Sequence, residues 1–190
     1  EGSPRAIDVL VQQRKSSHYV LKRLVPALRA RGVRVEVQDG WVDDLVDLFN
    51  SAKVYLYDSA EHWRAAGVSE GFGLPPLEAM ACGCVVFSSF NHALADTLTP
   101  GESAHQIGQG LLSNDVERIA EAVANPGSWK LESSRLYALI ETFSEEALLQ
   151  RWNITLAELD NFFVHTASTS EALFLRSRPT WWLRMRRFIR

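Results

Sequence analysis

The chain alternates short apolar segments with segments of helical periodicity, and this alternation restricts its fold more than any other feature. The apolar segments of strand length are residues 6–11, 33–37, 53–57, 84–88 and 104–107. The segments with helical spacing are residues 19–31, 42–51, 116–124, 129–142 and 145–163. Alternating strands and helices form a parallel sheet, because each helix must cross back over one face of it. The sequence therefore predicts an α/β fold, a Rossmann-like parallel sheet with helices on both faces and extra C-terminal helices. Ligands of such folds bind at the carboxyl ends of the strands.

The length and composition indicate one main domain and a short tail. A chain of 190 residues, 46% of them hydrophobic, buries a substantial core, and this length is typical of a single domain. We assign residues 1–175 to the Rossmann-like domain and residues 176–190 to a tail with six arginines and no acidic residue. Because the net charge of the chain is −3, the rest of it is acidic, which disfavours nucleic acid as a partner.

A segment near the middle of the chain combines a glycine-containing loop with the start of a helix. Gly71 and Gly73 leave the backbone open to close approach by a ligand. Either Pro75 or Pro76 suits the first helical position, and Gly83 suits the residue that follows the helix. The N–H groups at the start of such a helix favour a phosphate or diphosphate group.

Two carboxylates, Glu70 and Glu78, flank this predicted anion site. Glu78 is expected in the first turn of the helix, on the side of the ligand. Carboxylates accept hydrogen bonds from neighbouring hydroxyl groups, so each can hold one sugar ring on either side of a diphosphate. The ligand that this arrangement indicates is a nucleotide sugar.

Residues 70–83 read Glu-Gly-Phe-Gly-Leu-Pro-x-Leu-Glu-Ala-Met-Ala-x-Gly, where x is any residue. This pattern closely resembles the donor-sugar signature of the retaining glycosyltransferases of family 4, the group 1 family. The resemblance implies the C-terminal, donor-binding half of a GT-B architecture. It implies transfer of a hexose from a UDP- or GDP-type nucleotide sugar to an unidentified acceptor, with retention and without a metal or other cofactor. It also implies an N-terminal acceptor-binding domain, in the same polypeptide or in another chain, without which this half is inactive.

The same resemblance implies roles for the residues of the signature. Glu70 is expected to contact hydroxyl groups of the transferred sugar, and Glu78 to bind the ribose of the nucleotide. The main-chain amides expected to bind sugar and phosphate are those of Gly71, Phe72, Gly73 and Leu74.

A basic pair follows the first predicted strand. In the family an arginine and a lysine near this position neutralise the departing diphosphate, and the corresponding residues are Arg14 and Lys15. We assign both, with Glu70, to the catalytic group. In the family the lysine lies several residues after the arginine, whereas Lys15 directly follows Arg14 here. The loop is therefore shorter than in the family, and Lys22 is a second candidate for the lysine.

Two segments depart from the family pattern. Residues 60–68 are inserted between the third strand and Glu70, and they are expected to form a flap or short helix near the donor site. Such a flap either tunes sugar specificity or only decorates the loop. After the fourth strand, residues 88–96 lack the usual glycines, and Asp96 replaces a glutamate. His92, in this segment, is the histidine nearest the predicted site.

The cysteines and acidic pairs of the sequence do not indicate a metal site or a disulfide. Cys82 and Cys84 are separated by one glycine, which suits small buried residues better than a disulfide. Asp43 and Asp44 resemble the acidic pair that holds a metal in other glycosyltransferases, but their place at a helix start favours capping.

The tail is predicted to form an amphipathic helix, with tryptophans on one side and arginines on the other. Its apolar face suits three partners equally: an anionic membrane surface, the N-terminal acceptor-binding domain, or its own domain. Since the sequence has no apolar run of twenty residues, we expect a cytoplasmic protein, peripheral to the inner face of the membrane if the tail binds lipid.

Two other functions compete with transfer. Nucleotide-sugar 2-epimerases share the architecture but lack the pattern at residues 70–83. A non-catalytic nucleotide-sugar-binding or scaffold module of a larger cell-surface polysaccharide assembly protein would keep the fold without the reaction.

Overall fold

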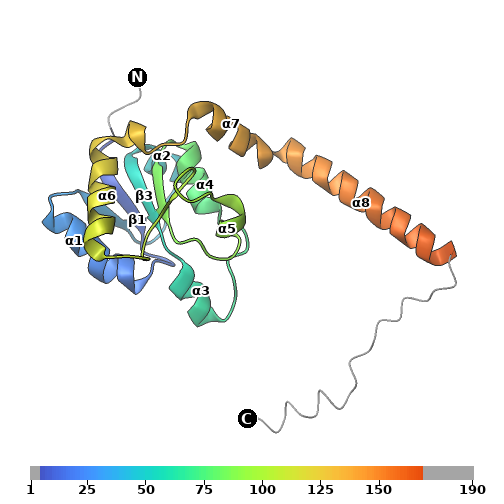
Figure 1. Ribbon diagram of the computed structural model, residues 1–190, viewed down its shortest axis with the longest axis horizontal. Coiled ribbons are helices and arrows are strands. Elements are labelled where there is room, and N and C mark those ends of the chain that lie inside the picture. The colour runs from blue at the N-terminus through green and yellow to red at the C-terminus, as the bar shows by residue number, and fades with distance from the viewer. Residues whose placement is uncertain (1–4, 169–190) are drawn as a thin grey trace, which may run out of the picture. The chain divides into compact units, whose positions relative to one another are not determined.

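The computed structural model describes residues 5–168, and the chain forms two compact units divided between Glu141 and Thr142. The first unit contains the parallel sheet (Figure 1). The predicted domain boundary after residue 175 and the predicted tail helix lie outside the described residues.

A five-stranded sheet forms the centre of the first unit, and its neighbouring strands are all parallel. The strands are β1 (Ile7–Gln12), β2 (Val35–Gln38), β3 (Ala52–Tyr57), β4 (Val85–Ser88) and β5 (His105–Gln106). Their order across the sheet is β2-β1-β3-β4-β5. At the centre of the sheet, Val9 of β1 pairs with Val35 of β2 on one side and with Val54 of β3 on the other. The predicted parallel sheet is thus confirmed.

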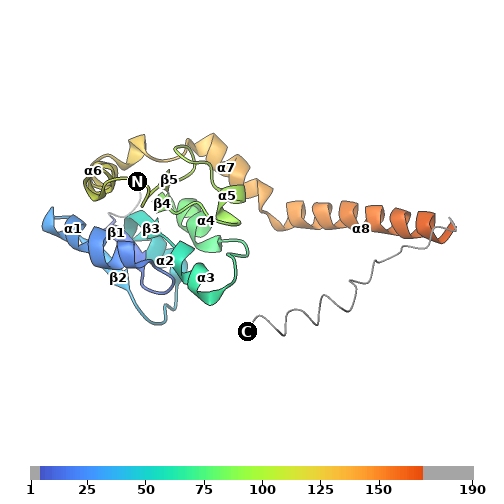
Figure 2. The same ribbon diagram turned by 60° about the horizontal axis from the view of Figure 1, so that its bottom comes forward.

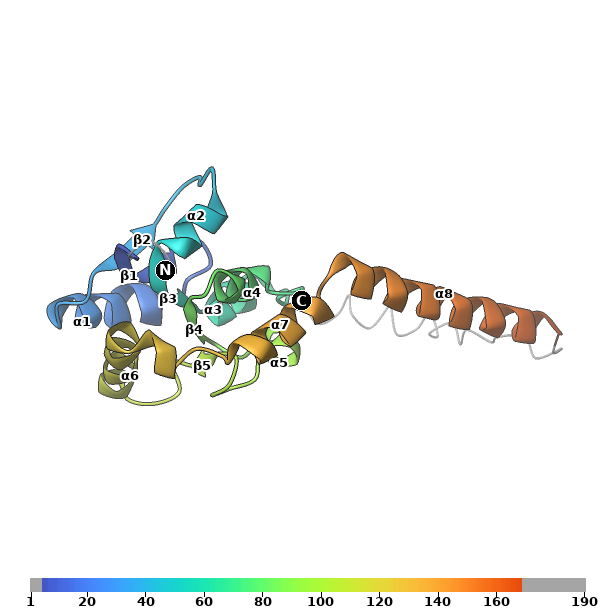
Figure 3. The ribbon, with the colours of Figure 1, turned by 90° about the horizontal axis from the view of Figure 1, so that it is seen from above.

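Helices cover both faces of this sheet, as predicted. One face is covered by the π-helical turn Val20–Leu24, α1 (Val25–Ala30) and α6 (Leu112–Ala124). The other face is covered by α2 (Leu45–Asn50), α4 (Leu74–Ala81), α5 (Leu94–Thr97) and α7 (Ser133–Thr142). Figures 2 and 3 show the strands between α1 and α6 on one side and α2 and α4 on the other.

The central strands β1, β3 and β4 are mostly apolar because both faces of the sheet are buried. Successive side chains of a strand point to opposite faces. In β1, Val9 and Val11 pack into the core beneath α1 and α6, whereas Leu10 packs into the core beneath α2 and α4. The continuous apolar runs seen in the sequence follow from this two-sided burial.

The strand order places the topological switch point between β1 and β3. From β1 the chain proceeds outward to β2, and from β3 it proceeds in the opposite direction to β4 and β5. In open parallel sheets, ligands bind outside the carboxyl ends of the strands at such a point. Here these ends are Gln12 of β1 and Tyr57 of β3.

The helix predicted over residues 19–31 differs from a regular α-helix in its first half. The N–H of Val25 donates to the carbonyl of Val20, five residues earlier, which makes this turn a π-helix. Pro26 follows directly, and a proline has no N–H and crowds the carbonyl four residues before it. Regular α geometry therefore begins only at Val25.

The later helices occur as predicted, but with different bounds. α6 begins at Leu112 rather than at residue 116. α7 begins at Ser133 rather than at residue 129, because Pro126–Ser128 forms a 3-10 turn. The carbonyl of Trp129 accepts a hydrogen bond from His105 Nε2 (2.9 Å), which ties this connection to the sheet.

The second unit is described mainly by one long helix, α8 (Glu145–Ser168), which runs past residue 163, where it was predicted to end. Many of its apolar side chains are exposed, including those of Trp152 and Phe163. Among the helices that the structure describes, none is long and apolar enough to cross a membrane.

Candidate functional site

A cavity of about 320 Å³ lies at the carboxyl ends of the neighbouring strands β2, β1 and β3. The loop after β1, the loop after β2, the end of β3 and the start of α4 all contribute to its walls. Its lining includes Gln12, Arg14, Lys15, Trp41, Tyr57 and Pro75. The predicted basic pair therefore faces one cavity, at the edge of the sheet where a ligand was expected.

The loop after β1 holds Lys15 in an unusual backbone conformation. Its φ of 71° lies in the left-handed region, which costs roughly 1–3 kcal/mol for a residue other than glycine. The turn is closed by a hydrogen bond from the N–H of Ser16 to the carbonyl of Gln13 (3.2 Å). Such strain persists only where the surrounding contacts determine it. The side chain of Lys15 makes two contacts of this kind, with Glu70 and with Trp63.

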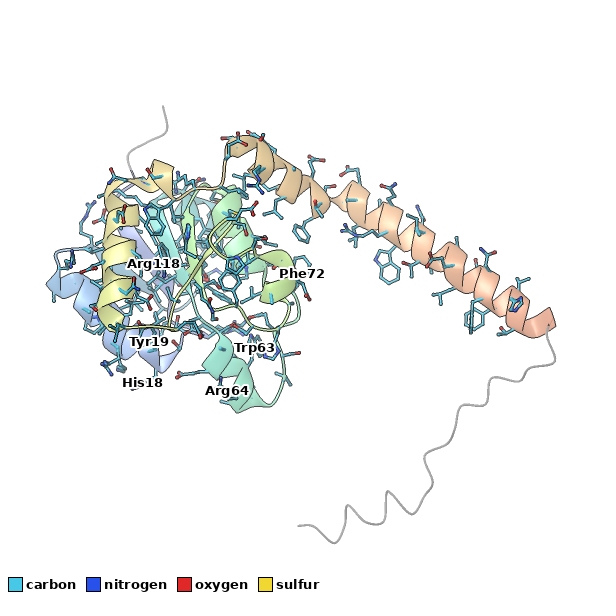
Figure 4. The ribbon with its side chains drawn as sticks, viewed as in Figure 1. His18, Tyr19, Trp63, Arg64, Phe72 and Arg118 are labelled. Carbon is cyan, nitrogen blue, oxygen red and sulfur yellow. The ribbon has the colours of Figure 1, made fainter. Side chains whose placement is uncertain are left out.

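Glu70 is a buried carboxylate held by three hydrogen-bond donors. Its side chain is 5% exposed. Oε2 accepts hydrogen bonds from the hydroxyls of Tyr57 (2.8 Å) and Ser59 (2.8 Å) and from the indole N–H of Trp63 (2.6 Å). Trp63 belongs to α3 (Ala60–Ala66), which is the short helix predicted for the inserted segment (Figure 4).

The surroundings of Glu70 keep it ionised. Burial raises the pKa of this carboxyl, but the hydrogen bonds from Trp63, Ser59 and Tyr57 and the charge of Lys15 lower it by more. The pKa of Glu70 is therefore below its ordinary value. Burial, followed by the hydrogen bond to Glu70, raises the pKa of Tyr57 well above its ordinary range, so this phenol keeps the proton that it donates.

Lys15 connects this carboxylate to the cavity. Its Nζ lies 3.9 Å from Glu70 Oε1 and 4.6 Å from the centre of the Trp63 ring. We call Lys15, Tyr57, Ser59, Trp63 and Glu70 the Glu70 cluster. The ion pair is partly solvated and contributes little to stability. The ammonium group of Lys15 nevertheless places one positive charge beside both the cavity and the Glu70 carboxylate.

The signature helix α4 begins at Leu74, one residue before Pro75 and two before Pro76, the two predicted starts, because Gly73 occupies the N-cap position with a φ of 79°. A Cβ atom on Gly73 would lie 2.3 Å from Cδ2 of Leu94, so the position requires glycine. Pro75 and Pro76 are the second and third residues of the helix, and proline has no N–H. The N–H groups that this helix start can offer to an anion are therefore those of Gly73 and Leu74.

Glu78 lies in the second turn of α4, so its predicted place in the first turn is wrong. The early start at Leu74 makes Glu78 the fifth residue of the helix, and its side chain is exposed. Burial raises the pKa of Tyr55, and the charge of Glu78 raises it further. The hydroxyl of Tyr55 donates to Gln12 of the cavity wall (2.6 Å). Glu78 itself is not among the described residues that line the cavity.

The remaining signature residues lie near the surface. Gly71, Phe72 and Leu74 are exposed. A Cβ atom on Gly71 would meet no atom within 4 Å, so the loop is open on that side. Three of the four residues with predicted amide contacts are therefore at the surface, whereas Gly73 is buried, and the roles of these amides stay predictions.

The end of α4 follows the prediction. Gly83 has a φ of 78°, its N–H donates to the carbonyl of Met80, and the N–H of Cys84 donates to the carbonyl of Ala79. These are the two hydrogen bonds of a Schellman motif. Cys84 is buried, Cys82 is partly buried, and both are free thiols, as predicted.

In the loop after β4, one residue has a left-handed backbone conformation, although this loop lacks the glycines of the family pattern. His92 is exposed and has a φ of 51°, which histidine tolerates better than most residues. The side-chain oxygen of Asn91 accepts a hydrogen bond from the hydroxyl of Ser89 (2.7 Å). Asp96 lies on α5 and is exposed. A histidine thus provides one backbone conformation that a glycine would otherwise supply.

The structure distinguishes between the candidates for the basic pair. Arg14 is exposed and lines the cavity together with Lys15. Lys22 is exposed on the π-helical turn and is not among the described lining residues. Lys15, not Lys22, is the lysine that the fold brings to Glu70.

The acidic pair at the start of α2 has a structural role. Asp44 is the N-cap residue, and its Oδ1 accepts a hydrogen bond from the N–H of Asp47 (3.0 Å). Asp43 accepts one from the indole N–H of Trp41 (3.0 Å). The capping interpretation of Asp44 is confirmed.

Three members of the Glu70 cluster were not assigned from the sequence: Tyr57, Ser59 and Trp63. Tyr57 ends a strand at the switch point, a position that could have marked it as a site residue. Trp63 could be placed near the site only because the inserted segment precedes Glu70 directly. Nothing in the spacing shows that all three side chains reach the same carboxylate oxygen.

Residues 20–130 match the sequence profile of a family described as glycosyl transferases group 1. This match covers more than half of the chain. The chain belongs to the group 1 glycosyltransferase family. The family match includes β3, α4 and β4 of this glycosyltransferase, so it contains the signature and the Glu70 cluster apart from Lys15.

The chain is also similar to individual proteins. Over 47 residues it is 45% identical to the serotype-specific mannosyltransferase WbdA of Escherichia coli, a match that covers 25% of this chain and 5% of WbdA. Its structure is similar to that of the pneumococcal O-GlcNAc transferase GtfA in complex with UDP and GlcNAc (TM-score 0.56, 14% identity), over 82% of this chain and 36% of that one. It is also similar to Anabaena Alr3699/HepE in complex with UDP-glucose (TM-score 0.53, 18% identity), over 83% of this chain and 42% of that one.

The structural likenesses extend over most of this glycosyltransferase chain but under half of either relative. At such low identity they concern the fold. They confirm the predicted architecture, a Rossmann-like α/β domain of the GT-B type.

Proposed function

We propose that this chain is the donor-binding half of a retaining glycosyltransferase that moves a hexose from a nucleotide diphosphate sugar to an acceptor. The observation that carries the proposal is the Glu70 cluster, an ionised buried carboxylate beside a cationic cavity at the switch point of the sheet. The relatives support the ligand class, since GtfA was solved with UDP and GlcNAc and HepE with UDP-glucose.

The cationic side of the site suits the leaving group. When the bond from the anomeric carbon to the diphosphate breaks, negative charge grows on the departing phosphate oxygen. Arg14 and Lys15 bring two positive charges to the cavity, and the N–H groups of Gly73 and Leu74 can add hydrogen bonds at the start of α4. Groups that are already oriented toward this charge lower the barrier more than solvent can.

The anionic side of the site suits the transferred sugar. A carboxylate fixed by Tyr57, Ser59 and Trp63 cannot turn away when a ligand enters. Hydrogen bonds from sugar hydroxyls to Glu70 would orient the ring, so that the acceptor reaches the anomeric carbon in a productive geometry. Retention of configuration is part of this proposal.

The acceptor site belongs, in this proposal, to an N-terminal domain in the same polypeptide or in another chain. The chain spans only 36% of GtfA and 42% of HepE, so a large part of each relative has no counterpart in it. We propose the cytoplasm, at the inner face of the membrane if the tail binds lipid, as the place of transfer.

Calorimetric titration with UDP, UDP-glucose, GDP and GDP-mannose tests the donor site. We expect one nucleotide and its sugar to bind, and the variant Glu70→Gln to bind the nucleotide sugar about 10- to 100-fold more weakly. This range corresponds to the loss of a charged hydrogen bond of roughly 1.5–3 kcal/mol. Glutamine has nearly the same shape, so the change removes mainly the charge.

The matched control is Glu121→Gln, which changes an exposed glutamate of α6 in the same way. It should bind like the wild type. Absence of binding for all four ligands, or equal binding by wild type and Glu70→Gln, would contradict the proposed donor site.

A further inference from the structure

The inserted helix α3 is fastened across the switch point of the sheet by two of its side chains. The carboxylate of Glu61 accepts a hydrogen bond from the main-chain N–H of His18 (2.6 Å), where the helix after β1 begins. Trp63, two residues further along the helix, donates to Glu70 and lies under the ammonium of Lys15. Figure 4 shows Trp63 on α3 at the same end of the first unit as His18. The insertion is therefore tied to the helix after β1 and to the Glu70 cluster rather than being a loose loop.

The three donors to Glu70 all use the same oxygen. Tyr57, Ser59 and Trp63 donate to Oε2 at 2.8, 2.8 and 2.6 Å. A carboxylate oxygen has about two lone-pair sites, so three donors saturate Oε2 and leave no position on it for a ligand. Among the residues that the structure describes, the ion-pair partner of the other oxygen, Oε1, is the ammonium of Lys15, at 3.9 Å, which is longer than a hydrogen bond. Oε1 therefore retains its capacity to accept hydrogen bonds.

We propose that Trp63 is a positioning residue that fixes Glu70 so that Oε1 alone receives the hydroxyl groups of the bound sugar. This inference rests on the proposed function, since it concerns the same carboxylate. It assigns the inserted helix a role in sugar recognition rather than in loop decoration.

Trp63 is the donor that determines this orientation. The last torsion of a glutamate is broad, so a carboxylate turns easily unless several groups hold it. Tyr57 and Ser59 approach from the end of β3, whereas Trp63 approaches from α3 and forms the third support. Its ring also holds the ammonium of Lys15 through a cation–π contact. One side chain thus orients the carboxylate and the cation together.

The variant Trp63→Phe keeps an aromatic ring but removes the indole N–H. We expect it to bind UDP and GDP nearly as the wild type does, because the phenyl ring still provides a face for the ammonium of Lys15 and, in this proposal, neither ligand reaches Glu70. The additional affinity that the sugar of UDP-glucose or GDP-mannose provides should fall about tenfold, which corresponds to about 1.4 kcal/mol. The matched control is Trp152→Phe on α8, an exposed tryptophan outside the cluster, which should keep this sugar-dependent gain.

A second measurement needs no ligand. The carboxyl carbon of Glu70 can be titrated by ¹³C NMR in wild type, Trp63→Phe and Tyr57→Phe. Each variant removes one hydrogen bond to the ionised carboxylate, so the pKa of Glu70 should rise in both. A purely structural role for Trp63 would leave this pKa unchanged in a folded variant.

The outcomes separate the two proposals. If the wild type gains affinity from the sugar and Trp63→Phe gains just as much, the positioning role is wrong and the donor site stands. If the pKa of Glu70 rises in both variants but no nucleotide sugar binds to the wild type, the donor site is wrong and the assignment of Oε1 to a sugar falls with it. An unchanged pKa in Trp63→Phe overturns the positioning role directly.

Discussion

Replacing Gly73 with alanine should strongly destabilise the first unit, because the signature loop fits against the buried side chain of Leu94. Gly73 forms the N-cap of α4 with a φ of 79°, in the left-handed region. A Cβ atom there would lie 2.3 Å from Leu94 Cδ2 and 3.2 Å from Leu94 Cγ. Leu94 is completely buried, so its side chain can move only by displacing or repacking its neighbours in the core.

Two costs add in this variant. An alanine in the left-handed region costs roughly 1–2 kcal/mol relative to glycine. The ordinary contact distance between carbon atoms is about 3.5–4 Å, so Leu94 must move by more than an ångström within a packed core. Overpacking of this kind typically costs about 1–3 kcal/mol. The free energy of unfolding should therefore fall by about 2–5 kcal/mol, a large part of the stability of a typical domain.

Urea unfolding followed by near-ultraviolet circular dichroism measures this change. Trp129, packed against Phe87 and His105, provides a signal from the first unit. The matched control is Gly71→Ala, whose Cβ would meet no atom within 4 Å and whose φ lies outside the left-handed region. It should change the free energy of unfolding by less than about 1 kcal/mol.

A double variant separates the two costs. In Gly73→Ala with Leu94→Ala the clash is absent, so the combined loss should be smaller than the sum of the single losses by about 1–3 kcal/mol. Additive losses would mean that Leu94 does not meet the new methyl group. A loss in Gly73→Ala no larger than in Gly71→Ala would refute the whole argument.

Two further predictions concern stability. Asp44→Ala should lower the free energy of unfolding by about 1 kcal/mol, because it removes the N-cap of α2, whereas Asp43→Ala should change it little in the same urea titration. Arg34 and Lys53 hold the pKa of Asp8 well below its ordinary value despite its burial, so the unfolded chain takes up this proton first as the pH falls. The stability that Asp8 contributes is therefore complete above about pH 4 and decreases below it. The destabilisation caused by Asp8→Asn, roughly 2 kcal/mol at pH 7, should be smaller at pH 3, and an equal value at both would contradict this assignment.

The fold could be predicted from the sequence because its signals are local. The apolar runs of β1 and β3 reflect burial on both faces, which a parallel sheet requires. Gly83 and Asp44 mark a helix end and a helix start through hydrogen bonds within a few residues. Helix bounds were less predictable where a proline intervened, as at Pro26, since the π-helical turn there depends on how the helix accommodates the ring.

The first residue of α4 could not be predicted from local sequence signals alone. Two consecutive prolines suggested that one of them opens the helix, which would have placed Glu78 in the first turn. The helix begins instead at Leu74, because the backbone of Gly73 packs against Leu94. Gly73 belongs to the signature and Leu94 to α5, so this contact joins residues that are far apart in the sequence. This earlier start makes Glu78 the fifth residue of the helix and so places it in the second turn.

The sequence by itself determined the family, the parallel sheet and the identity of Glu70, Arg14 and Lys15 as candidates, since each depends on a residue pattern or on its place after a strand. Only the tertiary structure decided that Lys15 reaches Glu70 and that Tyr57, Ser59 and Trp63 share one oxygen of it. The physical reason is that the orientation of a buried carboxylate depends on donors from separate segments, here the loop after β1, the end of β3 and α3. Their meeting point is set by the strand order of the sheet, which no spacing in the sequence records.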